Sequence, residues 1–122
     1  MQIQINTDHN IEGREALATH VTNVLQHALQ RLSAHITRVE VHLGDENSDK
    51  NSHHDKRCML EARMEGRPPV AVTHHADNLH QAIAGATEKL TRKIDDLVSR
   101  QHDQKIRSGA GVAAVAALPD AP

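Results

Sequence analysis

Hydrophobic and polar residues alternate along the first part of the chain with two different periods. Residues 2–6 alternate polar and apolar side chains with a period of two, which is typical of a strand with one buried face. From about residue 14 to 33, apolar residues recur at spacings of three and four, and this spacing predicts a helix with one apolar stripe. Residues 36–43 return to a period of two and predict a second strand.

The second half of the chain predicts two more strands and a long helix. After a polar loop, residues 57–65 alternate again, and a turn that contains glycine and proline at 66–69 leads to a short strand at 70–73. Asp77 can cap a helix whose apolar stripe continues to roughly residue 104. Because each predicted strand has one apolar face, we expect both helices on the same side of the sheet.

The order of these elements, β-α-β-β-β-α, predicts an α+β fold with a four-stranded sheet and two helices packed on one face. The first helix connects two strands of one sheet, so its crossover should be right-handed and should place these strands side by side in parallel. Residues 1–106 should form this single domain. The segment 107–122 is rich in Ala, Gly and Pro and has few bulky apolar residues, so we expect a disordered tail there.

The composition narrows the range of functions. The chain has 122 residues, with 14 Lys and Arg against 16 Asp and Glu, 11 His, one Cys and no Phe, Tyr or Trp. The lack of aromatic residues excludes proteins that bind single strands by stacking bases on such side chains. The net charge of −2 means that nucleic-acid binding would need a local basic patch. No apolar run reaches the roughly 18 residues of a membrane span, and no signal-peptide pattern opens the chain.

Motifs of enzymes and cofactor sites are missing or incomplete. One cysteine cannot form an internal disulfide framework or a Cys-based zinc cluster. Cys58 falls on the apolar face of its predicted strand, so we expect a small core residue and not a nucleophile. The segment that begins at Asp45 resembles the start of a calcium loop, but Lys50 and Lys56 replace the glycine and the glutamate that such a loop requires. We therefore expect neither an enzyme nor a bound cofactor.

Histidine suggests an alternative function. His53–His54 and His74–His75 are adjacent pairs, and His80 lies one turn into the last predicted helix. A hairpin of the third and fourth strands could bring these side chains together, but a metal site needs three or four ligands in a fixed geometry. The simpler interpretation is surface histidines in loops, and we assign no metal ligand. The alternative function is a pH- or metal-responsive interaction protein on the same fold.

The last predicted helix carries a stripe of basic residues. With about 100° of rotation per residue, Lys89, Lys93 and Arg100 fall within about 40° of one another, and Arg92 lies about 60° to the side. Asp96 lies on the same stripe and can offset part of the repulsion between the two lysines. Such a stripe can be a solvated helix face or a phosphate-binding surface, and the stripe alone does not distinguish the two.

Two motifs of this helix resemble a known family. Residues 77–83 (DNLHQAI) and 88–94 (EKLTRKI) are similar to the last helix of the ribosome hibernation-promoting factors, a family that includes the ribosome-associated inhibitors, protein Y and the sigma modulation proteins. The opening strand MQIQI, the strand at 38–41 and the order of the elements also resemble this family. The resemblance covers about residues 1–104 and implies the same α+β fold.

The resemblance also implies a function. Members of the family bind the small ribosomal subunit in the channel of messenger and transfer RNA, and they hold ribosomes idle under stress. Binding of this kind depends on the shape and the phosphates of folded RNA, for which Lys and Arg on rigid helices suffice. By this match, Lys89, Arg92 and Lys93 are the best candidates for phosphate contacts. Weaker candidates, argued from charge alone, are Arg100 and, at a strand edge, Lys56 and Arg57.

The resemblance further implies a cytoplasmic protein whose partner is the small ribosomal subunit and its RNA, with neither DNA nor a membrane as a partner. Long members of the family carry a second domain that pairs ribosomes, and the Ala-rich segment here offers no such dimerisation domain. The chain also departs from the family pattern, because His80 replaces a tyrosine and Thr19–His20 replace a charged and aromatic pair. It resembles a divergent, short member.

The abundance of histidine predicts that the protein binds polyanions more tightly below neutral pH. An unperturbed histidine titrates near pH 6.5, so protonation of all 11 histidines adds 11 positive charges to the formal charge of −2 and gives +9. We expect the affinity for polyanions such as RNA to rise steadily from pH 7.5 to 5.5 in a fluorescence-anisotropy titration. A flat or falling affinity over this range would contradict the prediction.

Overall fold

The computed structural model of the chain describes residues 1–8, 11–46 and 55–112, and side chains within these ranges as far as residue 100. The elements follow the predicted order β-α-β-β-β-α, with one short 3-10 helix, η1, added before the second strand. Their bounds are β1 (Gln2–Thr7), α1 (Arg14–Ala28), η1 (Gln30–His35), β2 (Ile36–Asp45), β3 (Lys56–Met64), β4 (Val70–Ala76) and α2 (Leu79–Val112).

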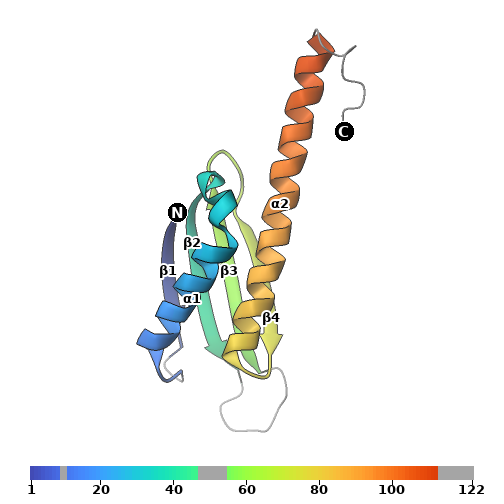
Figure 1. Cartoon of the computed structure of the whole chain (residues 1–122). Helices are drawn as coiled ribbons and strands as arrows, with labels where there is room; N and C mark the ends of the chain where they lie inside the picture. Colours follow the sequence, from blue (N-terminus) through green and yellow to red (C-terminus); the bar gives the residue numbers. More distant parts are fainter. Residues whose placement is uncertain (9–10, 47–54, 113–122) are drawn as a thin grey trace.

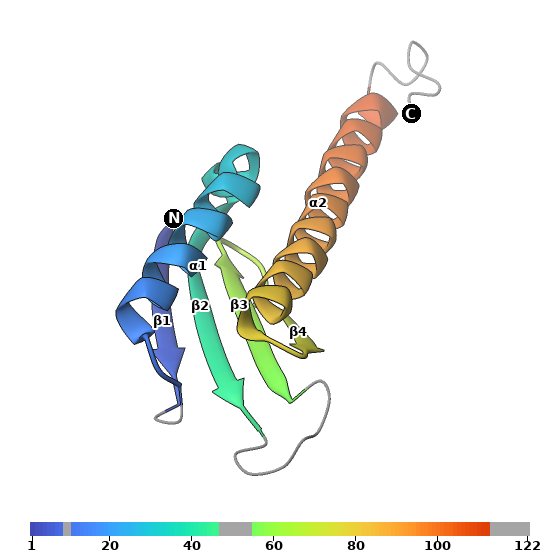
Figure 2. The ribbon, with the colours of Figure 1, turned by 60° about the horizontal axis from the view of Figure 1, so that its bottom comes forward.

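The four strands form one mixed sheet in the order β1-β2-β3-β4 (Figure 1). β1 runs parallel to β2, as the crossover through α1 predicts, and the other two neighbouring pairs are antiparallel. α1 and α2 lie side by side across one face of the sheet, and no other described element covers the opposite face (Figure 2). The predicted α+β fold with both helices on one face is therefore confirmed.

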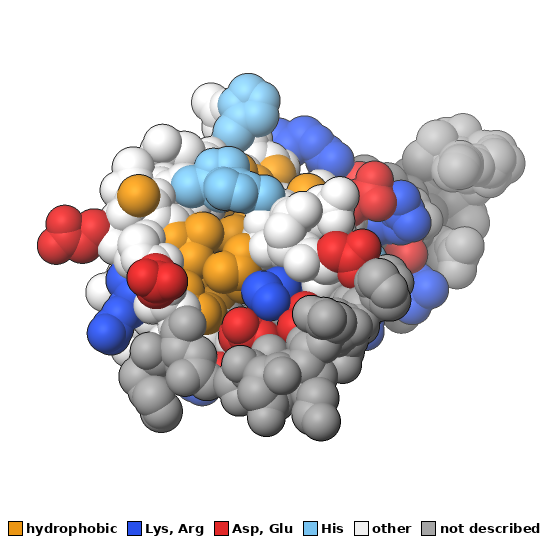
Figure 3. Space-filling model, turned by 90° about the horizontal axis from the view of Figure 1, so that it is seen from below, with side chains coloured by type: hydrophobic (Ala, Val, Ile, Leu, Met, Phe, Trp, Pro, Cys, Tyr) orange, Lys and Arg blue, Asp and Glu red, His pale blue; other side chains and the backbone are white. Residues whose placement is uncertain are grey.

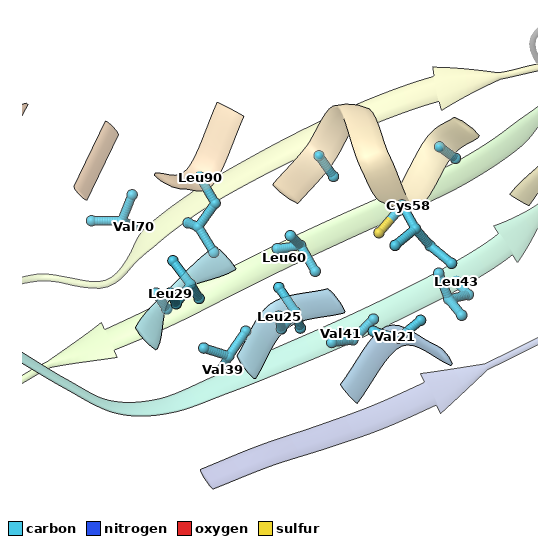
Figure 4. Packing of buried hydrophobic residues seen from close by; sticks show 14 of the residues in the cluster. Val21, Leu25, Leu29, Val39, Val41, Leu43, Cys58, Leu60, Val70 and Leu90 are labelled. Carbon is cyan, nitrogen blue, oxygen red and sulfur yellow. The ribbon is translucent and has the colours of Figure 1, made fainter. Parts of the chain in front are cut away.

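An aliphatic layer fills the space between the sheet and the helices (Figure 4). Val21 and Leu25 of α1 and Leu90 of α2 are fully buried against the inner faces of β2 and β3. On the sheet side, Val41 lies opposite Leu60 in the β2–β3 register, and both are fully buried. Burial of one such side chain stabilises the fold by about 1.5–3 kcal/mol, so this layer is the main source of stability.

The first helix ends earlier than the predicted boundary at about residue 33. The α-helical part stops at Ala28, and the chain continues as the 3-10 helix η1 up to His35. The backbone N–H of Leu32 donates to the carbonyl of Leu29 at 2.9 Å, and both leucines are buried. A 3-10 helix has three residues per turn, so residues three positions apart lie on the same side of it. Leu29 and Leu32 therefore both face the core.

β4 and the start of α2 also differ from the prediction. β4 extends to Ala76, beyond the expected end at residue 73, so His74 and His75 lie in a strand and not in a loop. Asn78, and not Asp77, caps α2: its Oδ1 accepts a hydrogen bond from the backbone N–H of Gln81 at 2.8 Å. The first backbone N–H groups of a helix have no acceptor within the helix, and the side chain of Asn78 supplies one for Gln81.

α2 ends later than predicted. It continues to Val112, past the expected end near residue 104, and beyond the sheet it extends away from the rest of the domain (Figure 1). Residues 107–112, which we expected in a disordered tail, are therefore helical; the remaining part of that prediction, 113–122, lies outside the described residues. Gln101, Gln104, Lys105 and Arg107 have high helix propensities, which favour continuation of the helix past residue 100.

A glycine inside α2 allows the helix to lie close to β4. His74 is opposite Cys58 in the β3–β4 register and points to the helix side of the sheet. A Cβ atom at Gly85 would overlap the imidazole ring of His74, so only glycine leaves room for this ring between β4 and α2. The packing explains why a residue with poor helix propensity occupies the middle of a helix.

Substitution of Gly85 should reveal this contact. We expect Gly85→Ala to lower the free energy of unfolding by about 1–3 kcal/mol, because the new methyl group overpacks the His74 ring. In a His74→Ala background the same substitution should instead raise the free energy of unfolding by up to about 1 kcal/mol, through helix propensity. Urea denaturation of the four proteins measures this reversal, and equal effects of Gly85→Ala in both backgrounds would contradict it.

Candidate nucleic-acid interface

The basic side chains selected on α2 all point away from the core. Ile83, Leu90 and Ile94 are buried on one side of the helix, and this apolar stripe fixes how the helix lies on the sheet. The selected cations lie outside that stripe and are exposed: Lys89, Arg92, Lys93 and Arg100. The helix therefore presents them to solvent on a rigid support.

Lys89 and Lys93 occupy the flank of α2. Lys89 Nζ donates a hydrogen bond to the backbone carbonyl of Thr73 at 3.0 Å, so the lysine is held beside the edge strand β4. An ammonium group has three donors, and this bond leaves two of them for a ligand. Lys93 follows one turn later and, within the described part of the chain, has no hydrogen bond or ion pair. Both lysines can therefore contact phosphates without breaking the domain.

Arg92 has a weak acidic partner. Its Nη2 lies 3.8 Å from Oε1 of Glu88, and the two side chains are 74% and 73% exposed. An ion pair of this kind contributes only about 0–1 kcal/mol, so a phosphate can replace Glu88 at little cost. The next acid along the helix, Asp95, is already engaged, because Arg31 donates to both of its carboxylate oxygens at 3.0 and 2.9 Å. These hydrogen bonds lower the pKa of Asp95 and connect α2 to η1.

Lys56 and Arg57 lie in a different environment. They begin β3, which is a central strand, so the expectation of a strand edge is wrong. Lys56 Nζ is 3.2 Å from Oδ1 of Asp55 and 3.4 Å from Oδ2 of Asp45, and the hydrogen bond to Asp55 raises the pKa of the lysine. Arg57 Nε lies 3.4 Å from Oε2 of Glu46. Because acids already partner both cations, they form a balanced group separate from the cations of α2.

The uncovered face of the sheet is also balanced in charge. Glu40 lies within ion-pair distance of Arg38 on its own strand and 3.8 Å from Arg63 on β3. Arg63 is also 3.7 Å from Glu61. Sequence analysis did not find this network, because its members meet only through the register of β2 with β3. The face therefore offers less uncompensated positive charge than α2 does.

Arg67 is a further cation that sequence analysis did not select. It lies in the turn between β3 and β4, and its Nη2 donates to the carbonyl of Leu97 in α2 at 3.5 Å. Leu97 lies between Lys93 and Arg100 along the helix, so the guanidinium adds positive charge beside the basic stripe. Arg67 lies in a turn, where no periodic pattern of residues indicates which way a side chain points. Its position beside α2 follows only from the fold.

The histidines that the structure describes do not converge on a metal site. His74 faces α2, whereas His75 points to the opposite face and its Nε2 lies 3.0 Å from Oε1 of Glu46. The ring of His80 instead contacts that of His20. Over residues 1–8, 11–46 and 55–100, no group of three or more His, Cys, Asp or Glu side chains could hold a metal ion. The pair at positions 53 and 54 lies outside the described residues.

The described residues form a small α+β domain whose long helix presents exposed cations. Comparisons with known proteins identify the family of this domain. A family model described as "Sigma 54 modulation protein / S30EA ribosomal protein" matches residues 3–102, and the chain belongs to this family, whose members are not enzymes. None of the described helices is long and apolar enough to cross a membrane.

Two solved structures share this fold. The N-terminal domain of protein Y from Thermus thermophilus is 20% identical with a TM-score of 0.64, and the match covers 80% of this chain and 99% of that one. A ribosomal subunit interface protein from Coxiella burnetii is 14% identical with a TM-score of 0.59, and the match covers 81% of this chain and 99% of that one. A search of curated proteins found no match to the chain.

The buried cysteine should be chemically inert in the folded protein. Cys58 is fully buried on the inner face of β3, as the sequence predicts, and burial raises the pKa of its thiol to about 12. At pH 8 the thiol therefore stays protonated and cannot act as a nucleophile. We expect no reaction with a thiol reagent such as dithionitrobenzoate under native conditions and one equivalent in 8 M urea. Rapid native labelling would contradict this assignment.

Proposed function

We propose that this protein binds the small ribosomal subunit through its RNA, in the channel of messenger and transfer RNA, and holds ribosomes idle under stress. Membership of the sigma 54 modulation and S30EA family supports a ribosomal partner, as does the fold shared with a ribosomal subunit interface protein. Such a partner places the protein in the cytoplasm. The observation that carries the proposal is the row of exposed cations on α2, of which Lys93 has no acidic partner among the described residues.

The proposed binding depends on phosphates and on shape. A rigid helix that presents Lys89, Arg92 and Lys93 can match phosphates along a folded RNA, and each contact releases counterions into solution. Stacking of bases on Phe, Tyr or Trp is not needed for recognition of this kind, which agrees with the composition. The protein acts by occupying the site and not by catalysis.

The candidate contacts differ in strength. Lys89, Arg92 and Lys93 form the primary group, and Arg100 extends it along the helix. Lys56 and Arg57 are secondary, because RNA would have to compete with the acids that already partner them. A charge change on α2 should therefore weaken binding more than the same change elsewhere.

Removal of the three primary charges tests this function. In the variant Lys89→Gln/Arg92→Gln/Lys93→Gln, we expect co-sedimentation with small ribosomal subunits to be lost at physiological salt. The slope of log K against log salt, which is negative, should become smaller in magnitude by about 2 to 3, because each phosphate contact contributes about 0.7–0.9 to that magnitude. Sedimentation over a range of KCl concentrations measures both quantities.

A control variant separates local contacts from net charge. Gln2→Glu/Gln4→Glu/Gln26→Glu lowers the net charge by the same amount at three exposed positions away from α2. We expect this variant to keep the wild-type salt slope and most of the affinity. Failure of the unmodified protein to sediment with the subunits at low salt and pH 6.5 to 7.5 would overturn the proposed function.

A further inference from the structure

A second candidate site lies at the end of the molecule where both main helices begin. A pocket of about 320 Å³ opens there. Six residues line it: Glu12, Gly13, Ala16, Leu17, Leu79 and His80. Its volume is at the low end of the range of about 300–1,000 Å³ for small-molecule sites, which suits one planar ring system. The phosphate contacts proposed above use none of these residues.

The walls of the pocket suit a flat, partly polar ligand. Leu17 and Leu79 supply apolar side chains, and Gly13 and Ala16 leave space above them because they are small. Seen from this end, histidine side chains lie beside an exposed patch of hydrophobic side chains (Figure 3). His80 is exposed and borders the pocket, so its imidazole can stack on a ligand that rests on the leucines.

His20 fixes the position of the His80 ring. The two rings, from α1 and α2, are 4.4 Å apart between centroids and meet edge to face at 78°. Aromatic rings favour this arrangement, which restricts the rotation of an otherwise exposed side chain. His20 is therefore a positioning residue, and His80 is the group that would contact the ligand.

Glu12 supplies the polar recognition. Its side chain is exposed on the wall of the pocket and, among the described residues, makes no hydrogen bond or ion pair. A carboxylate accepts hydrogen bonds only, and it accepts best from two donors side by side. The Watson–Crick edge of guanine presents two such donors, N1–H and the N2 amino group. Adenine and cytosine offer one amino group beside an acceptor, and uracil offers a single N–H.

We propose that this pocket binds one unstacked guanine base of the RNA, with the base between His80 and the apolar wall and its Watson–Crick edge on Glu12. The inference rests on the proposed function, because it names a base in the RNA that α2 contacts through phosphates. It adds a point of sequence recognition to binding that is otherwise based on charge and shape. Loss of the stacking contact should weaken binding about tenfold.

Chemical probing of guanines tests the proposal directly. Kethoxal reacts with N1 and N2 of guanine, the atoms that Glu12 would cover. We expect small ribosomal subunits saturated with the wild-type protein to contain a guanine that is protected from kethoxal. Glu12→Gln, at saturating concentration, should return this guanine to the reactivity of free subunits. His80→Ala should weaken binding about tenfold, and His20→Ala should weaken it less.

Matched controls keep the proposal falsifiable. Glu15→Gln and His35→Ala change an exposed carboxylate and an exposed imidazole outside the pocket, and both should keep the protection and the affinity. Circular dichroism should give the same melting temperature for Glu12→Gln as for the wild type. If the variants sediment with the subunits and no guanine depends on Glu12, the guanine site is overturned and the proposed function stands. If the wild type does not sediment, the proposed function itself fails, and the guanine site with it.

Discussion

The burial of one aliphatic layer between the sheet and the two helices determines most of this structure. The chain has no Phe, Tyr or Trp to fill the core, so Leu, Ile, Val and Ala fill most of it. Small residues in α2, such as Ala82 and Ala86, are fully buried and allow the helix to approach the sheet closely. Gly85 continues this close approach over His74. The layer fixes the rotation of α2, and with it the direction of the charged side chains from Glu88 to Arg100.

Charge is distributed so that one surface stays basic although the protein as a whole is slightly acidic. Glu40 and Glu61 balance the arginines on the uncovered face of the sheet, and other acids balance the cations at the start of β3. On α2, Arg92 is paired only weakly, with the exposed Glu88, and Asp95 is held by Arg31. A net charge of −2 is therefore compatible with a local phosphate-binding helix.

Histidine takes a structural part at two contacts between elements. His74 fills the space between β4 and Gly85, and His20 meets His80 where α1 and α2 begin. In both cases an imidazole ring lies at the contact between α2 and a neighbouring element, which is β4 for His74 and α1 for His20. These rings lie at two separate places in the fold, and the described part of the chain holds no ligand cluster.

The sequence by itself determined the order of the strands and main helices, the parallel pairing of β1 with β2, the inward face that holds Cys58, and the exposed cations of α2. These features follow from periodicity and from connection rules, which depend on residues near in the chain. Only the tertiary structure decided that Lys56 pairs with Asp45 and Arg57 with Glu46, that Arg67 reaches α2, and that His20 contacts His80. Such contacts depend on strand register and on helix packing between distant segments. The local pattern of polar residues specifies neither of these.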